Sequence, residues 1–188
     1  MNFKYIPSAG RGSQIVGLRQ RPGLNHSAIA GRSFVPTPVW VGICSGYSLP
    51  ITNGSDYEEL TFKHSVPRRW DQVSDPTFSV HCAIDTANTD KKFKLNFAWE
   101  HFSTGDIIPA TSNNVPVETS IVGAASQYKS YKIDFTIDYD IDVGDAIVPG
   151  DTLVGKLTRI AASSAEITGE VIIIDWWLNY WRGYYGGS

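Results

Sequence analysis

Cysteine, methionine and long apolar runs are all scarce in this 188-residue sequence, which has two Cys and one Met. Cys44 and Cys82 are too few for a disulfide framework, and both lie in short apolar segments, so we expect two buried free thiols. A protein of this kind is made in a reducing cytoplasm. No stretch has the length and hydrophobicity of a signal peptide or a transmembrane helix, so we expect neither export nor membrane insertion.

Acidic residues are absent from the first 55 positions, which hold five Lys or Arg, whereas the rest of the chain has 19 Asp or Glu against 11 Lys or Arg. Residues 1–37 are also rich in Gly, Ser and Pro and show little periodicity. We predict a basic, extended N-terminal arm over residues 1–37 that orders against a partner, followed by one domain over residues 38–188. A disordered tail is the alternative. The net charge of −3 and the dilute cations of the arm do not favour a nucleic-acid-binding protein.

Helical periodicity is missing too, because no segment places apolar residues at i, i+3, i+4 and i+7 beside a capping residue. Period-two alternation takes its place. From Lys132 to Val143 every second residue is apolar and most of the others are acidic, which predicts one half-buried strand. Further strands are predicted at 39–44, 57–64, 78–85, 93–102, 117–122, 152–160 and 171–181. This spacing, with Gly and Pro between strands, predicts an all-β, antiparallel jelly-roll sandwich of about eight strands.

The closing strand, 171–181, is apolar on both of its faces, so we expect it to be covered on both. The predicted inward set is Ile172, Ile174, Trp176 and Leu178. Trp177 and Trp181 lie on the opposite side, which we expect to be covered by a subunit interface or by the N-terminal arm. The arm carries apolar residues that cannot bury themselves alone. Its predicted interface residues are Ile15, Val16, Leu18, Phe34, Arg19 and Arg21.

Motifs for catalysis are absent. No His has HExxH spacing, no Cys lies at metal-ligand distance from another, and there is no GxSxG or GxGxxG. We therefore expect neither enzyme activity nor a cofactor. Three aspartates on one side of the predicted strand, Asp138, Asp140 and Asp142, are candidate Ca²⁺ ligands. A solvated acidic face and a dock for the basic arm of a neighbouring subunit are the alternatives.

Three segments carry a more specific pattern. Residues 66–84 contain a Val-Pro, a basic–Trp step and a strand ending in His; residues 91–110 contain an aromatic-rich strand and a loop with a late Pro-Ala. Residues 153–181 contain an Arg at the end of one strand and a Gly before a hydrophobic final strand. In these features the chain resembles a family of small β-jelly-roll proteins of tailed bacteriophages and viral metagenomes. Ser79 stands where that family has a second His. The resemblance implies a virion-associated structural protein without catalytic residues.

We therefore expect a non-enzymatic structural component of a phage-like virion, such as a capsid, head-decoration or tail-associated protein, made in the host cytoplasm. It would assemble through its jelly roll and arm as a homo-oligomer, and analogy with viral jelly rolls favours a homotrimer. Its expected partners are other virion proteins. The alternative is a carbohydrate- or receptor-binding module of a tail fibre, since Trp and Tyr rings can stack on sugars; a concave sheet face with an exposed Trp would favour it.

Overall fold

The computed structural model describes residues 38–50, 58–68, 70, 72, 74–141 and 146–180. These residues form strands and no helix, which confirms the predicted all-β class. Three short strands are β1 (Pro38–Val41), β5 (Asn88–Thr89) and β8 (Ala124–Ala125). The long strands are β2 (Cys44–Leu49), β3 (Glu59–Ser65), β4 (Thr77–Ile84), β6 (Lys92–Phe102), β7 (Asn113–Ser120), β9 (Ser130–Thr136), β10 (Thr152–Ile160) and β11 (Val171–Asn179).

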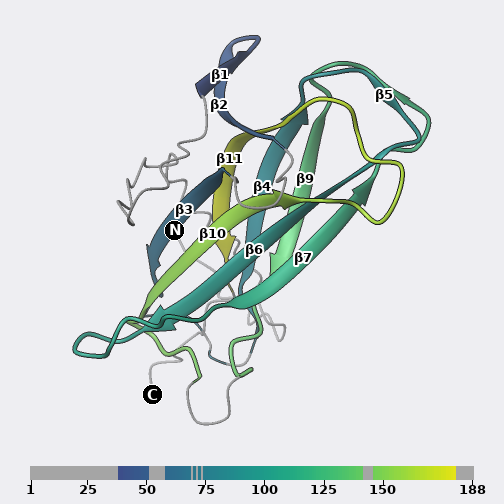
Figure 1. Cartoon of the computed structure of the whole chain (residues 1–188). Helices are drawn as coiled ribbons and strands as arrows, with labels where there is room; N and C mark the ends of the chain where they lie inside the picture. Colours follow the sequence, from purple (N-terminus) through teal and green to yellow (C-terminus); the bar gives the residue numbers. More distant parts are fainter. Residues whose placement is uncertain are drawn as a thin grey trace, which may run out of the picture.

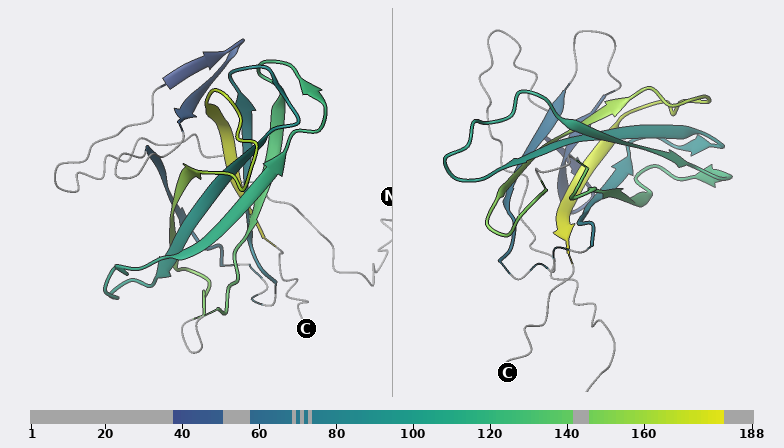
Figure 2. Two further views of the ribbon diagram at one scale, coloured as in Figure 1. Left: turned by 45° about the vertical axis from the view of Figure 1, so that its right-hand side comes forward. Right: turned by 90° about the horizontal axis from the view of Figure 1, so that it is seen from below.

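The long strands and β1 form two antiparallel sheets that pack face to face, and β5 and β8 pair separately in a small two-stranded sheet (Figures 1 and 2). The five-stranded sheet has the order β1-β2-β11-β4-β9, and the four-stranded sheet has the order β3-β10-β6-β7. The pairs are nested: β6 pairs with β7, β4 with β9, β3 with β10, and β2 with β11. A long hairpin rolled into a sandwich gives this order, which is that of a jelly roll. The predicted fold is confirmed.

The connections gather at two ends of the sandwich (Figure 1). The upper end in that view carries the β1–β2 hairpin and the connections β4–β6, β7–β9 and β10–β11. The lower end carries the connections β3–β4, β6–β7 and β9–β10. Loops at the ends of a rigid sandwich are the usual place for contacts with other molecules.

The core lies between the sheets and is largely aromatic. Strand β6 alternates as predicted, with buried residues at every second position from Phe93 to Trp99. The Phe97 ring stacks on Phe78 of the opposite sheet, with ring centroids 4.1 Å apart. Gly155 in β10 faces the same ring, and a Cβ there would lie 2.5 Å from it. The glycine in this strand therefore makes room for an aromatic side chain.

Two predicted strands have different bounds. The segment 39–44 is not one strand, because Gly42 adopts a φ of +60° and turns the chain between β1 and β2. The segment Lys132–Val143 leaves the sheet after Thr136, and Ile147 N–H donates to the Tyr139 carbonyl where the chain folds back. The alternation continues past the strand because Ile137 and the aromatic ring of Tyr139 are covered by loop residues of the lower end.

The predicted inward set of β11 is half wrong. A β-bulge between Ile173 and Asp175 inserts one residue and shifts the alternation. Trp176 and Leu178 lie in the core as predicted, but the other two core positions are Val171 and Ile173. Ile172 is buried outside the core cluster, and Ile174 is the inserted, half-buried residue.

Candidate functional site

Large exposed apolar side chains mark the two ends of the sandwich. In the described part of the chain they are Trp40, Ile43, Ile107, Ile108, Val122, Tyr128, Ile141 and Val148. All lie in β1, in turns or in loops, and none of those described lies on the outer face of a long strand. Exposed apolar side chains on loops are candidate contact points for other molecules where several lie together.

The β1–β2 hairpin extends beyond the body at the upper end (Figures 1 and 2). Only the last part of β2, Tyr47–Leu49, pairs with β11, so the rest of the hairpin pairs with itself. We call Trp40 and Ile43 the hairpin tip; their side chains are 74% and 99% exposed. Cys44 beside them is also exposed, which corrects the expectation of two buried thiols, whereas Cys82 is buried as predicted.

At the lower end, the β6–β7 loop projects from the body (Figure 1). We call Ile107 and Ile108 the loop tip; they are 92% and 68% exposed. The base of this loop is closed by Asp106, whose carboxylate accepts a hydrogen bond from the Ser103 N–H at 2.8 Å. The loop tip is therefore held out from the sandwich on a closed turn.

Asp151 connects the lower loops to one another. Its buried carboxylate accepts hydrogen bonds from the Ser103 hydroxyl, from the Val148 N–H at 2.9 Å and from His101 Nδ1 at 2.9 Å. Its carbonyl accepts a bond from the Val66 N–H at 2.7 Å. Burial alone would raise the pKa of Asp151, but these hydrogen bonds outweigh it and lower the pKa.

Ser103, His101 and Asp151 are the residue types of a nucleophilic triad, but their arrangement is different. In a triad the imidazole lies between the hydroxyl and the carboxylate and takes the proton of the hydroxyl. Here the carboxylate lies between the other two, and Ser103 donates to Asp151. This cluster holds loops in place and does not activate the serine.

The upper loops are joined by several separate contacts. Asp85 accepts a hydrogen bond from the Glu170 N–H at 2.8 Å, and Asn88 accepts one from the Thr168 N–H at 3.1 Å. Two further ties join this end. The Ser163 N–H donates to Glu118, and the buried Arg159 donates to Glu166 and to the Gly169 carbonyl. Hydrogen bonds from Ser163 and Lys92 lower the pKa of Glu118 to about 2.

Trp177, a predicted interface residue, lies on the outer face of the five-stranded sheet and is half-buried. The His81 ring packs edge-on against it with centroids 4.6 Å apart, and Lys132 Nζ lies 5.8 Å from the centroid of its ring. The chain's own side chains thus cover part of this Trp.

Beside Trp177, Ser79 is fully buried and donates a hydrogen bond of 2.5 Å to Asp134. It also accepts one of 2.7 Å from the Asn179 amide. Polar groups therefore surround the tryptophan on this face, and the predicted subunit contact there stays a prediction.

The candidate calcium ligands Asp138 and Asp140 lie in the loop after β9, where both are exposed. A hydrogen bond with Asp138, together with repulsion from Asp138 and Asp75, raises the pKa of Asp140. Within the described residues, no three His, Cys, Asp or Glu are grouped closely enough to hold a metal ion. Asp142 lies outside those residues.

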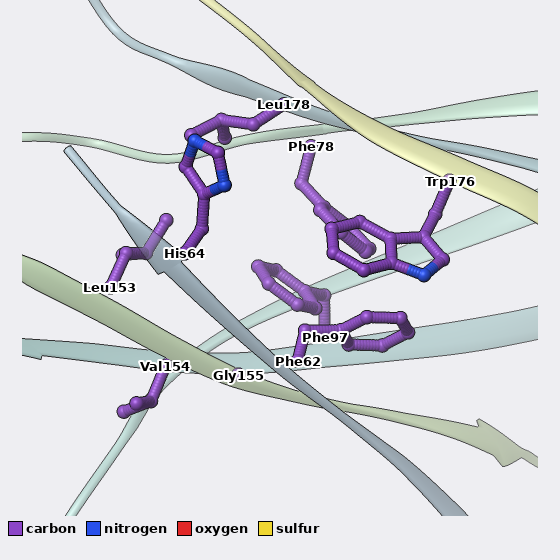
Figure 3. A pocket seen from close by; sticks show the side chains of 9 residues that line it. All are labelled: Phe62, His64, Phe78, Phe97, Leu153, Val154, Gly155, Trp176 and Leu178. Atoms are coloured by element: carbon purple, nitrogen blue, oxygen red, sulfur yellow. The ribbon is translucent and has the colours of Figure 1, made fainter. Parts of the chain in front are cut away.

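A small apolar hollow lies between the sheets, lined by aromatic and aliphatic side chains and by His64 (Figure 3). Burial lowers the pKa of His64, and no described group forms a hydrogen bond with its Nε2 atom. The hollow is an imperfection in core packing between Phe62, Phe97 and Trp176. It is too small and too enclosed by core residues to act as a ligand site.

The remaining predicted interface residues fall outside the described residues. They are Trp181 in the C-terminal segment, and Ile15, Val16, Leu18, Arg19, Arg21 and Phe34 in the arm. Sequence reasoning missed the hairpin tip and the loop tip. A signal for the loop tip was present, because two consecutive Ile residues in an otherwise polar loop have no core strand to join.

No protein-family model and no curated protein matches this sequence. Among solved structures, the K3 adhesin domain of Lys-gingipain from Porphyromonas gingivalis is 12% identical with a TM-score of 0.35, and the match covers 72% of this chain and 73% of that chain. A CBM36-1 domain of a xylanase from the hindgut metagenome of Trinervitermes trinervoides is 10% identical with a TM-score of 0.32, covering 79% and 93%.

The CBM22-1 xylan-binding domain of Xyn10C from Paenibacillus barcinonensis is 10% identical with a TM-score of 0.33, covering 82% and 91%. All three TM-scores are below 0.5, so the jelly roll is assigned from the strand order of this chain alone. Among the residues described, no helix has the length and hydrophobicity needed to span a membrane.

Proposed function

We propose that this protein is a non-enzymatic structural subunit of a phage-like virion that assembles with copies of itself. The β1–β2 hairpin is the observation that carries the proposal. It extends past the sandwich core, carries no charged residue between Pro38 and Pro50, and exposes Trp40 and Ile43. Only Tyr47–Leu49 of the hairpin pairs with the body, and two strands alone are marginally stable in water, so a covering surface would stabilise the part that projects.

The jelly roll and the sequence resemblance to phage proteins support the same role. Jelly rolls occur in viral capsid proteins, and they also occur in lectins. The Ser103–Asp151–His101 cluster has the geometry of a loop clamp, which agrees with a role that needs no chemistry.

Self-assembly is tested by measuring the mass of the full chain in solution with light scattering. We expect a homo-oligomer, with a trimer as the favoured state, and we expect the double variant Trp40→Ser/Ile43→Ser to be a folded monomer. Val122→Ser is the matched control, because Val122 is 86% exposed outside both tips. A wild-type chain that stays monomeric at every concentration would contradict assembly. An antibody against the chain should label purified virions of the virus that encodes it. Absence of labelling would contradict the virion role.

A carbohydrate-binding module is the second candidate, favoured by Trp177 and its polar neighbours on an outer sheet face. An aromatic ring flanked by hydrogen-bonding groups is the usual way to bind a pyranose. On this reading, Trp177→Ala should abolish binding in a glycan array while the oligomer stays intact. If the wild-type chain binds no glycan, this candidate is rejected.

A further inference from the structure

The hairpin tip and the loop tip lie at opposite ends of the same molecule (Figures 1 and 2). Both are apolar and strongly exposed, from 68% at Ile108 to 99% at Ile43. Covering only one of them would leave the other in water in every subunit. A contact that covers both must therefore join unlike ends of two molecules or recruit two different partners.

Charge distinguishes the two ends further. Residues 1–37 lead directly into β1 and contain five Lys or Arg with no Asp or Glu. The lower end carries exposed carboxylates at Asp75, Asp138 and Asp140, crowded enough to raise the pKa of Asp140. The cationic segment thus precedes the hairpin in the sequence, and the anionic loops lie at the same end of the sandwich as the loop tip (Figure 1). Both ends expose apolar side chains, and the segment that precedes the hairpin has the opposite charge to these loops.

The lower end is also built to receive a partner. Asp151 holds the β6–β7 and β9–β10 connections together, and Asp106 closes the base of the loop. A surface held in place by such contacts loses little conformational freedom when it binds. The hairpin, by contrast, pairs with the body only through Tyr47–Leu49.

We propose that the hairpin tip of one copy docks on the loop tip of the next copy, so that subunits associate head to tail. This inference rests on the proposed self-assembly and adds which end of one copy meets which end of the next. A heterologous contact of this kind closes into a ring or continues as a filament, whereas a symmetric contact between two hairpins stops at a dimer. A symmetric contact would also leave Ile107 and Ile108 uncovered.

Cys44 provides a natural probe, because it is exposed beside the hairpin tip, whereas Cys82 is buried and its pKa is raised to about 12. The experiment introduces a thiol at the loop tip with Ile108→Cys and oxidises the full-length protein with copper phenanthroline. Each subunit then presents one thiol at each end. We expect disulfide-linked dimers, trimers and larger species that disappear on reduction. If three subunits close a ring, the ladder should stop at three.

Two variants serve as controls. Val122→Cys adds a thiol at a position even more exposed than Ile108, away from the loop tip, and should give no ladder. Cys44→Ser combined with Ile108→Cys removes the hairpin thiol and should also give none.

Two outcomes would overturn the inference in different ways. Efficient Cys44–Cys44 dimers in the wild-type chain, with no larger species in Ile108→Cys, would disprove the head-to-tail contact and leave self-assembly intact. A chain that is monomeric by light scattering and forms no cross-link in any variant would disprove both.

Discussion

The two ends of the sandwich are held together by different means. At the upper end, Asp85 and Asn88 both tie the β4–β6 connection to the β10–β11 connection, and Glu118 and Arg159 add separate ties from β7 and β10 to that same connection. At the lower end, one carboxylate, that of Asp151, joins segments from two connections and a strand end. Contacts spread over several residues tolerate the loss of one, whereas a shared acceptor does not.

This difference also separates the ends by chemistry. At the lower end, both the Asp151 carboxylate and His64 of β3 are buried, and burial lowers the pKa of His64. The upper end relies on Arg159 and on Glu118, whose pKa of about 2 keeps it ionised in mild acid. Acid should therefore loosen the lower end first, and the following predictions test how far this contrast holds.

The largest effect is expected for Asp151→Asn. Asn has only one oxygen that can accept a hydrogen bond, so its NH₂ group would face another donor, such as the Val148 N–H or the Ser103 hydroxyl. We expect the free energy of unfolding to fall by about 3 kcal/mol. Chemical denaturation at pH 7 measures it. The matched change at the upper end, Asp85→Asn, keeps an oxygen for the Glu170 N–H and should cost about 1 kcal/mol. Equal costs would remove the contrast between the ends.

The second prediction concerns pH. Burial lowers the pKa of His64 in the fold, whereas in the unfolded chain this residue takes up a proton as the pH falls below about 6.5. Stability should therefore fall between pH 7 and pH 5, by up to about 1.4 kcal/mol per unit. His64→Leu should remove this dependence, and His81→Gln, at an exposed position, should retain it. Hydrogen exchange at pH 5 should rise first at amides of the lower end; earlier exchange in the β10–β11 loop would contradict the contrast.

A smaller effect is expected for Asn88→Ala. Asn88 accepts from Thr168 and donates to the Thr86 carbonyl at 3.1 Å, so its loss should cost about 1.5 kcal/mol. Because Asp85 still joins the same connections, amides of the β10–β11 loop should stay protected. Loss of that protection would indicate that the upper end, too, depends on a single residue.

The smallest effect is expected for Glu118→Gln at the molecular surface. The pKa of Glu118 is lowered in the fold, so its contribution is present above the unfolded value near 4.3 and is lost as the pH falls towards 2. Thermal midpoints of the variant and the wild-type chain should differ slightly at pH 6 and converge at pH 2. A difference that persists at pH 2 would contradict a role for the charge.

Most of the fold could be predicted from alternation alone. Successive side chains of a strand point to opposite faces of the sheet, so the sequence predicts the inward residues of β6 and the buried Phe78, Val80 and Cys82 of β4. The bulge at Ile174 could not be predicted, because it depends on the register with β4. For the same reason the inward residues of β11 were correct only beyond the bulge.

The candidate surfaces were less predictable. The role of Asp151 depends on segments that are far apart in sequence, such as Val66 and Ser103, and no local pattern encodes their meeting. Exposure of Trp40 depends on the turn at Gly42, which divides an apolar run that reads as one strand. The expectations of a virion role, a trimer and an interface at Trp177 stay predictions.

The nested strand order has a consequence for the way the chain is made. Strand β11 lies between β2 and β4 in the middle of the five-stranded sheet, yet of the strands described it comes last along the chain. Until Val171–Asn179 has left the ribosome, the nascent chain holds two separated pieces of that sheet, and the aromatic side chains of β6 are not fully covered. Folding can begin locally at β6–β7, but closure of the sheet has to wait for Val171–Asn179. A ribosome stalled before residue 171 should therefore present a protease-sensitive intermediate, and one stalled on a linker fused after Ser188 a protected domain.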